Sequence, residues 1–305
     1  MDPVSKAADD IRSMRVRGAA LIGKHAAAAL SEFAASWDGS DAALDHAALT
    51  LVAARPTAVS LPNAVEFVVR RARGGARGAR PPGSVVSARA ALQEAASEFT
   101  RRAGAALTDI GRHGAALISD GSVVLTICNS QGAITPMVEA HRQGKRFQAI
   151  ALETRPWRQG LLTAKQLHEV GIDTSFAVDS AMWTLLGEAD LVLVGADSLA
   201  QNGDVVNKIG TAGLAQLAHE KKVPFHCCAE TFKLHPRAAT GADVPIEERG
   251  AVEVAKPGDL PAGVHIRNPV FDVTPHALIT SYVTELGCLK RDELVPAARN
   301  QWEVL

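Results

Sequence analysis

The sequence has 305 residues, with 32 Lys and Arg against 33 Asp and Glu, which gives a formal net charge of −1 at pH 7. This length favours two domains, or one large one, with enough interior for a sizeable core. Because the charges balance, no overall positive field could hold nucleic acid or anionic lipid by charge alone. The composition predicts a globular protein that binds neither and that meets any anionic ligand with local groups.

The cysteine pattern and the apolar runs narrow the setting further. The four cysteines show no CxxC spacing, and adjacent strand residues such as Cys227 and Cys228 point to opposite faces. We therefore expect neither a metal site nor a disulfide framework. The N-terminal stretch MDPVSKAADD lacks the apolar core of a signal peptide, and no stretch approaches the length of a membrane span. We expect a cytoplasmic, soluble protein with reduced thiols.

Up to about residue 118 the sequence is rich in Ala, and apolar residues recur at helical spacing in segments 11–37 and 88–118. We expect residues 1–118 to form a helical N-terminal domain. Between those segments lies RRARGGARGARPPGS, residues 70–84, where Gly, Pro and Arg cluster. Such runs usually mark loops, so we interpret this stretch as a solvated connection rather than a specific anion site.

From residue 119 onward, short β-rich runs alternate with segments long enough for helices. Strand then helix, repeated, is typical of a parallel sheet covered on both faces and built from right-handed crossovers. The fold class is therefore α/β, with a Rossmann-like domain over residues 119–305. The expected strands are 123–128, 147–153, 174–179, 191–197 and 224–230, and the expected helical segments are 135–145, 163–171, 180–189 and 207–222.

Each expected strand ends in a polar residue after an almost wholly apolar run. The carboxyl ends of parallel strands open onto one ligand crevice, so these side chains should meet at one edge of the sheet. An acid at a strand end can instead cap the next helix, and for Asp179 the two interpretations are evenly balanced. The five residues are Cys128, Glu153, Asp179, Asp197 and Glu230.

Two common nucleotide sites are disfavoured. CNSQGAI has one glycine where the dinucleotide fingerprint needs three, and no GxxxxGK[ST] occurs. Instead, NSQG (129–132) and NKIGT (207–211) each lead into a helix, where backbone N–H groups and the positive end of the helix dipole attract a phosphate. Lys208 would add a charge. A lone lysine near a helix start is ordinarily a solvated residue, but with Asn207 beside it and Gly210 and Thr211 following, we favour a phosphate site here.

A thiol and a carboxylate at two strand ends could form an acid/base pair. A free thiol titrates near pKa ~8.5, so Cys128 could act as a base only if helix dipoles or cations lower that pKa. Asp197 would need its pKa raised by burial to act as an acid near neutrality. The alternative for Cys128 is a small buried hydrophobic residue, and the chemistry alone leaves both open.

Eight collinear motifs carry a resemblance to a known superfamily. The sequence resembles the superfamily of methylthioribose-1-phosphate isomerase, ribose-1,5-bisphosphate isomerase and the alpha, beta and delta regulatory subunits of the eukaryotic initiation-factor exchange factor. The resemblance covers nearly the whole chain and implies a helical N-terminal domain before a Rossmann-like one. The motifs are RGAALIG (17–23), RPTAVSLPNAV (55–65), TICNSQG (126–132), ALETRPWRQG (151–160), VGAD (194–197), NGDVVNKIGT (202–211), AETFKLHP (229–236) and NPVFDVTP (268–275).

The resemblance also implies an enzyme. In the isomerases of this superfamily, the positions that match Cys128 and Asp197 hold the catalytic pair, and both residues are present here. RGAA at 17–20 and AETFKLHP look more like the ribose-1,5-bisphosphate branch. Asn129 looks more like the methylthioribose enzymes, since a histidine commonly follows the Cys in the bisphosphate branch. The substituent on carbon 5 of the substrate thus stays open, and a non-catalytic regulatory subunit is the alternative of another class.

By the same resemblance, a set of polar and small residues would line the substrate site. For Arg17 and Lys233 the alternative is ordinary surface charge, which the neighbouring Gly18 weakens for Arg17, because backbone N–H groups could approach a phosphate there. We leave Arg155 as a pocket candidate and interpret His226 and His235 as structural. The implied substrate-site residues are Arg17, Gly18, Ala19, Ala20, Arg55, Ser130, Gln131, Gly132, Asn207, Lys208 and Lys233.

The implied substrate class suggests a mechanism. A sugar with phosphate on its anomeric oxygen cannot open its ring as a free hemiacetal does, so an acid, for which Asp197 is the candidate, would protonate the ring oxygen. Cys128 would then take the proton from carbon 2 to give the ketose 1-phosphate, with a hydride shift as the rival step. No cofactor is required. The family implies a homo-oligomer, dimer or hexamer, and AMP as an activator in the bisphosphate branch.

Overall fold

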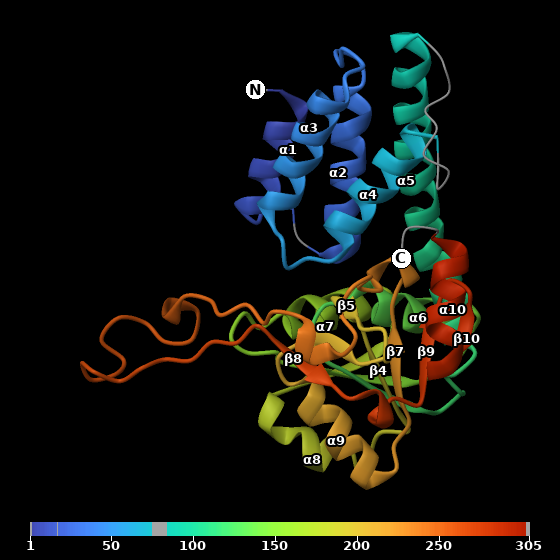
Figure 1. Ribbon diagram of the computed structural model, residues 1–305. Coiled ribbons are helices and arrows are strands. Elements are labelled where there is room, and N and C mark those ends of the chain that lie inside the picture. Colours follow the sequence, from blue (N-terminus) through green and yellow to red (C-terminus); the bar gives the residue numbers. More distant parts are fainter. Residues whose placement is uncertain (1, 17, 75–83, 303–305) are drawn as a thin grey trace. The chain divides into compact units, whose positions relative to one another are not determined.

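The computed structural model describes residues 2–16, 18–74 and 84–302 (Figure 1). The predicted connection at 70–84 therefore lies mostly outside the described residues, as does Arg17. The chain forms two compact units that are built from five stretches of sequence. The sequence pattern predicts only two continuous stretches, 1–118 and 119–305. The first unit comprises 1–106, 230–236 and 295–305, and the second comprises 107–229 and 237–294.

The first unit is helical, as the Ala-rich pattern predicts. Its first helix begins at Pro3, where Asp2 accepts a hydrogen bond from the Ser5 N–H at 3.0 Å, and Ser40 caps the third helix in the same way. The helices are α1 (Pro3–Arg12), α2 (Ala19–Phe33), α3 (Asp41–Ala54), α4 (Ser60–Ala72) and the first two-thirds of α5 (Val85–Ala115), joined by η2 (Thr231–Lys233) and the end of α10 (Arg291–Gln301).

Aromatic rings close the core of this unit. Phe99 lies 5.5 Å from Phe232 and 5.7 Å from Trp302 between ring centroids, and all three side chains are fully buried. Edge-on contacts of this kind add to the burial of the rings themselves. The Trp302 Nε1–H donates to Thr231 Oγ1 at 2.8 Å. Segment 230–236 is therefore packed into the helical unit, although it follows a strand of the other unit.

The second unit is built on a seven-stranded sheet in the order β10-β9-β7-β4-β1-β2-β3. The five predicted strands are confirmed as neighbours that pair in parallel, from β7 to β3. β9 extends the parallel set, and β10 pairs antiparallel to β9. The strands are β1 (Val123–Thr126), β2 (Gln148–Leu152), β3 (Asp173–Ala177), β4 (Leu191–Val194), β7 (Phe225–Cys228), β9 (Ser281–Thr284) and β10 (Gly287–Leu289).

Helices cover both faces of this sheet, because successive strand residues point to opposite sides. Val124 packs with Ile134 and Met137 on one face, whereas Leu125 packs with Leu214 on the other. In Figure 1, α6 and α7 accordingly lie on the opposite side of the sheet from α8 and α9. The helices are α6 (Gln131–Arg142), α7 (Gly160–Glu169), α8 (Met182–Leu185) and α9 (Thr211–Lys221).

A small antiparallel sheet was not predicted. It has the order β5-β6-β8, from β5 (Ser198–Leu199), β6 (Val205–Lys208) and β8 (Phe271–Thr274). The segment 207–222, expected to be helical throughout, therefore begins with the last two residues of a strand. Lys208 is paired with Phe271 across β6 and β8, and the helix starts only at Thr211.

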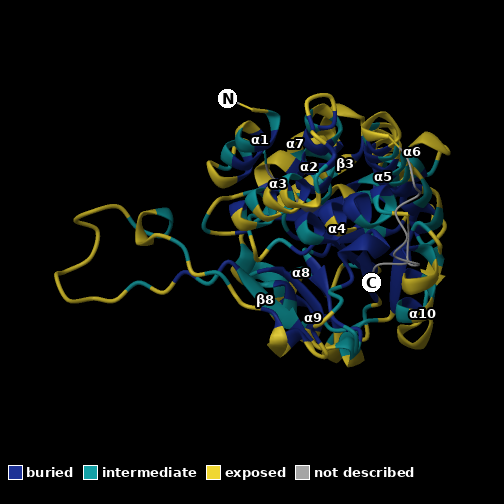
Figure 2. Cartoon of the chain, turned by 45° about the horizontal axis from the view of Figure 1, so that its top comes forward, coloured by how far each residue is buried: buried dark blue, intermediate teal, exposed yellow. Residues whose placement is uncertain are grey.

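Residues 245–268 leave the body of the second unit as a long exposed segment (Figures 1 and 2). Its base is tied down by backbone hydrogen bonds from Arg249 to Asn268 at 3.0 Å and from Val270 to Glu247 at 2.9 Å. The short 3₁₀ turns of this unit are η1 (Asp179–Ala181), η3 (Gly241–Asp243), η4 (Ala251–Glu253) and η5 (His276–Leu278). Across the described ranges, no helix has the length and apolarity to cross a membrane, and no cluster of His, Cys, Asp and Glu could hold a metal ion.

Candidate active site

The candidate site lies at the carboxyl edge of the parallel strands in the second unit. Cys128 follows β1, Glu153 follows β2, Asp179 follows β3 and Asp197 follows β4. The sequence predicted this common edge from the apolar runs that each residue terminates. Glu230, the fifth member of that set, follows β7 but belongs to the first unit.

The backbone of Cys128 is held in an uncommon conformation. Its φ is +72°, a left-handed value that costs a non-glycine residue about 1 to 3 kcal/mol. Two threonines hold the residue there: its N–H donates to Thr154 Oγ1 at 2.8 Å, and its carbonyl accepts from Thr163 Oγ1 at 2.7 Å. The conformation is thus fixed by side chains from the loop after β2 and from α7.

The Cys128 side chain is partly buried, and two charged side chains act on its thiol. Burial raises its pKa to about 11, the nearby Lys208 ammonium opposes that rise, and the Asp197 carboxylate adds to it. Both charges therefore lie close enough to act on the sulfur. The expectation that helix starts and cations lower this pKa is not met, because burial outweighs them, and the thiol is protonated at neutral pH.

Asn207 and Lys208 are the last two residues of β6, and Lys208 lies near this thiol. Both side chains are buried. Burial lowers the pKa of Lys208, and the charges of Cys128 and Asp197 act in the opposite direction. The ammonium lies 5.1 Å from the centre of the Phe271 ring, and the Asn207 amide donates to Thr211 Oγ1 at 3.1 Å. A buried lysine next to a thiol and a carboxylate is an arrangement suited to an anionic ligand.

The start of α6 brings Ser130 and Gly132 next to Cys128. Gly132 is required by packing, since a Cβ there would lie 2.2 Å from the Cys228 carbonyl oxygen. Ser130 is the N-cap residue, but its side chain makes no capping hydrogen bond and instead packs over Gly195, where an added Cβ would come within 2.0 Å of its Oγ. The backbone of this helix start therefore lies close to two strand ends.

Asn129 and Gln131 point toward α7 rather than across the strand ends. The Asn129 amide donates to Thr163 Oγ1 and to Gln166 Oε1, both at 3.0 Å. Gln131 donates to the same Gln166 oxygen at 3.3 Å. Asn129 thus supports Thr163, which in turn bonds the Cys128 carbonyl.

The start of α9 is occupied by a carboxylate that the sequence did not single out. Asp272 on β8 accepts hydrogen bonds from the Gly210 N–H at 2.7 Å and the Ala212 N–H at 3.1 Å. Burial raises the pKa of Asp272 to about 6, although these two N–H groups and Lys208 oppose the rise. The chain's own anion therefore fills the helix start at which NKIGT was expected to attract a phosphate.

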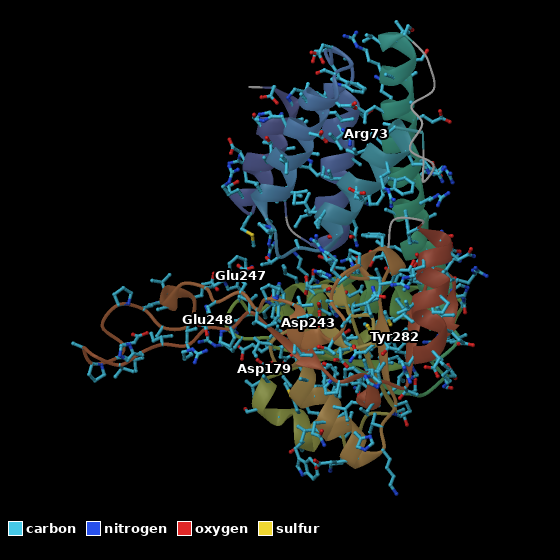
Figure 3. The ribbon with its side chains drawn as sticks, viewed as in Figure 1. Arg73, Asp179, Asp243, Glu247, Glu248 and Tyr282 are labelled. Carbon is cyan, nitrogen blue, oxygen red and sulfur yellow. The ribbon has the colours of Figure 1, made fainter. Side chains whose placement is uncertain are left out.

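Two further charged residues near Lys208, Arg249 and Glu247, were missed. Arg249 Nε donates to Glu247 Oε1 at 2.7 Å, and the Arg249 guanidinium lies 5.1 Å from the centre of the Trp157 ring. The charges of Arg249 and Glu247 both act on the pKa of Lys208. Figure 3 shows Glu247 at the base of the exposed segment 245–268. Only the resemblance of ALETRPWRQG pointed toward this cluster.

Asp179 organises the loop after β2 and does not cap the following helix. Its two carboxylate oxygens accept from the N–H groups of Thr154 at 2.7 Å and Arg155 at 2.8 Å. Because Thr154 also bonds Cys128, Asp179 supports the site indirectly. A cavity of about 570 Å³ opens here, lined by Glu153, Arg155, Arg158, Val178, Asp179 and Ser180.

The remaining predicted substrate-site residues belong to the first unit. Gly18 has φ +92° and precedes α2, of which Ala19 and Ala20 are the first residues. Arg55 is the residue that follows α3, and Lys233 lies in η2. The structure does not bring them together with Cys128 in one unit, so their part in a common site stays a prediction.

Lys233 is held firmly within that unit. Its Nζ lies 2.7 Å from Glu230 Oε2, and both side chains are buried. The amide of Asn63 on α4 donates to the carbonyls of Phe232 at 2.7 Å and Leu234 at 2.9 Å, on either side of Lys233. Asn63 therefore supports the segment that carries Lys233. It belongs to the motif RPTAVSLPNAV, but the sequence pattern did not single it out.

His226 lies inside the second unit, and its hydrogen bond is to β9 rather than to the residues around Cys128. Its Nδ1 is 2.8 Å from Ser281 Oγ, and burial lowers its pKa to about 4. It is therefore neutral at ordinary pH. This agrees with its interpretation as a structural residue.

Comparison with known proteins identifies the family to which the chain belongs. The model of the initiation factor 2 subunit family matches residues 15–291. The chain is 45% identical over 291 residues to a protein named ribose 1,5-bisphosphate isomerase from Archaeoglobus fulgidus, which covers 95% of this chain and 90% of that protein. It is 42% identical over 293 residues to a methylthioribose-1-phosphate isomerase from Gemmatimonas aurantiaca, covering 91% and 82%.

A solved structure shares the fold over almost the whole chain. It is described as the translation initiation factor eIF-2B of Pyrococcus horikoshii, with 32% identity, a TM-score of 0.80 and coverage of 95% of this chain and 98% of that one. The sequence-based resemblance and the α/β fold class are thereby confirmed. With its family model matched from residue 15 to residue 291, the chain belongs to the initiation factor 2 subunit family.

Proposed function

We propose that this protein is an aldose–ketose isomerase that converts ribose 1,5-bisphosphate to ribulose 1,5-bisphosphate. The enzyme class is supported by relatives that are named isomerases at 45% and 42% identity. The observation that carries the proposal is the grouping of Cys128, Asp197 and Lys208, a thiol, a carboxylate and a buried cation that act on one another electrostatically. These are the groups that an acid/base isomerisation of an anionic sugar needs.

In the proposed reaction, Asp197 protonates the ring oxygen as the ring bond breaks, and Cys128 removes the proton from carbon 2. As the carbonyl forms at carbon 2, the carbon 2 hydroxyl gives its proton to the Asp197 carboxylate, and the Cys128 thiol delivers its proton, which exchanges with solvent, to carbon 1. The phosphate on the carbon 1 oxygen stays in place. With a pKa of about 11, only ~10⁻⁴ of the Cys128 thiol is ionised at pH 7. Lys208 favours the thiolate, so its charge is part of what makes the base available.

The positive groups of the chain suggest how the phosphates are bound. Lys208 supplies a charge next to the reacting atoms, and the start of α6 supplies backbone N–H groups at Ser130 to Gly132. Arg17, Arg55 and Lys233 of the first unit are proposed as further phosphate ligands. Gly18, Ala19 and Ala20 would let the backbone approach closely, as the family resemblance implies.

The substrate class is tested by phosphorus NMR of the purified protein with ribose 1,5-bisphosphate and, in parallel, with 5-methylthioribose 1-phosphate. Conversion of the first alone supports the proposal. Conversion of the second alone moves the protein to the methylthioribose branch, which the Asn129 pattern favours, and leaves the mechanism intact. Turnover of neither substrate, even with AMP or another 5-substituted ribose 1-phosphate, contradicts an enzymatic role and favours a regulatory subunit.

The same experiment in deuterated water separates the two chemical routes. Proton removal from carbon 2 by Cys128 allows exchange, so solvent deuterium enters carbon 1 of the product. A hydride shift from carbon 2 to carbon 1 leaves no solvent label. Mass spectrometry of the product after complete conversion therefore decides between them.

Assembly, regulation and location are proposed on the family resemblance. We expect a homo-oligomer, either a dimer or a hexamer, that works in the cytoplasm and that AMP activates. Light scattering of the purified chain measures the assembly, and a titration of initial rate with AMP measures the activation. An unchanged rate at saturating AMP would contradict the regulatory part alone.

A further inference from the structure

Two adjacent residues of β8 flank the end of β6. In the register of the small sheet, Asp272 is the partner of Asn207 and Phe271 is the partner of Lys208. β8 therefore runs beside both residues that we place in the substrate site. The side chains of Phe271 and Asp272 are therefore placed to hold the end of β6 in position.

The Asp272 carboxylate spans the turn between β6 and α9. One oxygen accepts from the Gly210 N–H at 2.7 Å, and the other accepts from the Ala212 N–H at 3.1 Å. Gly210 has φ +98°, and a Cβ there would lie 3.1 Å from the Ile127 side chain, which immediately precedes Cys128. The turn held by Asp272 is thus packed against the residue next to the thiol.

Phe271 completes the arrangement from the other side. Its ring lies 5.1 Å from Lys208 Nζ, within the range of a favourable contact between a cation and an aromatic face. The Lys208 carbonyl accepts from Thr211 Oγ1 at 2.6 Å, so the backbone of Lys208 is also tied to the first residue of α9. A shift of the α9 start would therefore move Lys208 relative to Cys128.

We propose that Asp272 is a positioning residue, which holds the Gly210 turn and the start of α9 so that Lys208 stays beside the Cys128 thiol. The inference rests on the proposed function, in which Lys208 and Cys128 serve the isomerisation. It differs from a simple structural role, because Asp272 then acts on the chemistry through the position of Lys208.

Lys208 is a charged group that acts on the pKa of Asp272. Lys208 faces it from β6, the first turn of α9 carries no acidic residue, and Asp243 of η3 is bonded to Thr240. Burial raises the pKa of Asp272 to about 6, so the carboxylate is ionised at neutral pH and gains a proton in mildly acidic solution. Protonation would weaken its hold on the two N–H groups.

The test uses the alkylation rate of Cys128 in Asp272→Asn at pH 9, read by peptide mass spectrometry. If Asp272 keeps Lys208 beside the thiol, the variant loses the effect of the ammonium, the thiol pKa rises, and alkylation slows by ~3- to 10-fold. If Asp272 acts only by its own negative charge, removing that charge lowers the thiol pKa and alkylation speeds up. The sign of the change therefore decides, and an unchanged or faster rate overturns the proposal.

Asp204→Asn is the matched control. Asp204 also accepts from two backbone N–H groups, of Gly241 at 3.1 Å and His276 at 2.9 Å, but it is not among the groups that act on Lys208. We expect it to reduce thermal stability without slowing the alkylation of Cys128. Equal slowing in both variants would mean that general loosening of the unit, and not positioning, is the cause.

Formate provides a second test that does not depend on turnover. Asp272→Ala opens space at the start of α9, and formate can replace the carboxylate at the two N–H groups. We expect formate to raise the thermal midpoint of Asp272→Ala and to restore its Cys128 alkylation rate, with no such effect in Asp272→Asn. Failure of rescue together with normal alkylation in Asp272→Ala would contradict the inference.

Turnover then links the inference to the proposed function. On ribose 1,5-bisphosphate, Asp272→Asn should lower kcat ~10- to 100-fold, the size expected for a small misplacement of a reacting group. If the wild-type protein turns over no sugar phosphate, the proposed function fails, while the alkylation result still decides the role of Asp272.

Discussion

The starts of α6 and α9 look alike in the sequence and differ in the structure. Both follow a polar strand end, and both contain a glycine within the first residues. The start of α9 is filled by the Asp272 carboxylate, which accepts two of its N–H groups. At the start of α6 the Ser130 side chain makes no capping hydrogen bond, and Cys128 lies two residues before it.

This difference separates two roles that the pattern alone does not distinguish. A helix start attracts an anion, whether a ligand or a side chain of the same protein supplies it. At α9 the anion belongs to the chain, so this start organises Asn207 and Lys208. We therefore expect the substrate phosphate at the start of α6, and the predictions below test this division of labour.

The largest effect is expected at the two proposed reacting groups, Cys128 and Asp197. Cys128→Ser and Asp197→Asn should each lower kcat at least ~10² to 10⁴-fold, because positioned proton transfer contributes about that much. Initial rates with ribose 1,5-bisphosphate measure this loss. Cys288→Ser is the control, since Cys288 is exposed and its thiol donates to the His113 carbonyl rather than to a residue of the site. A Cys128→Ser enzyme with nearly normal kcat would remove the thiol from the mechanism.

Removing the cation at the α9 side should come next. Lys208→Met removes the charge that opposes the raised pKa of Cys128, so the thiol pKa should rise and alkylation at pH 9 should slow by ~10-fold or more. Lys222→Met, at the other end of α9, should change nothing. Equal alkylation rates in wild type and Lys208→Met would show that the ammonium does not act on the sulfur.

The pH dependence of the wild type follows from the same thiol. A base works only when deprotonated, and the pKa of Cys128 is about 11. The value of kcat/KM should therefore rise close to tenfold per pH unit above neutrality, up to the limit of protein stability. A profile that levels off near pH 7 would mean that another group is the base.

The main sheet and its polar edge could be predicted from the sequence, because each strand is a local apolar run that stops at a polar residue such as Cys128 or Asp197. The small sheet could not, since β6 pairs with β8 more than sixty residues later and Asn207 and Lys208 look like the polar start of a helix. The raised pKa of Cys128 also escaped prediction, because burial depends on the folded surroundings rather than on the helix starts visible in the sequence.

Supporting residues were invisible for a related reason. Thr154 and Thr163 bond the backbone of Cys128, yet each is an ordinary hydroxyl residue in its own segment. Asp272 acts through hydrogen bonds to residues about sixty positions away. A hydrogen bond between distant segments leaves no periodic pattern, so only the structure identifies these partners.

One glycine in each helix allows α6 and α9 to be compared by the effect of a Gly→Ala substitution on the free energy of unfolding. Gly132→Ala should destabilise the protein by about 1 to 3 kcal/mol, because the new Cβ would lie 2.2 Å from the Cys228 carbonyl oxygen and the start of α6 would have to move. Gly213→Ala in the first turns of α9 meets nothing within 4 Å, so it should stabilise by about 0.5 to 1 kcal/mol. Chemical denaturation of both variants measures the difference. Similar values would mean that the packing of α6 against β7 is looser than the structure indicates.

The last comparison concerns the pH dependence of stability at the start of α9. The pKa of Asp272 is about 6 in the folded protein against an ordinary 3.8, so between these values the native state keeps a proton that the unfolded chain has released. Asp272 therefore contributes stability that is fully present below pH 3.8 and is lost as the pH rises through about 6. The free energy of unfolding of wild type, relative to Asp272→Asn, should fall by about 2 to 3 kcal/mol across that window at most. Parallel curves for the two proteins would mean that the carboxylate is ionised throughout, which would place its pKa near the ordinary value and strengthen its hold on α9 in acid.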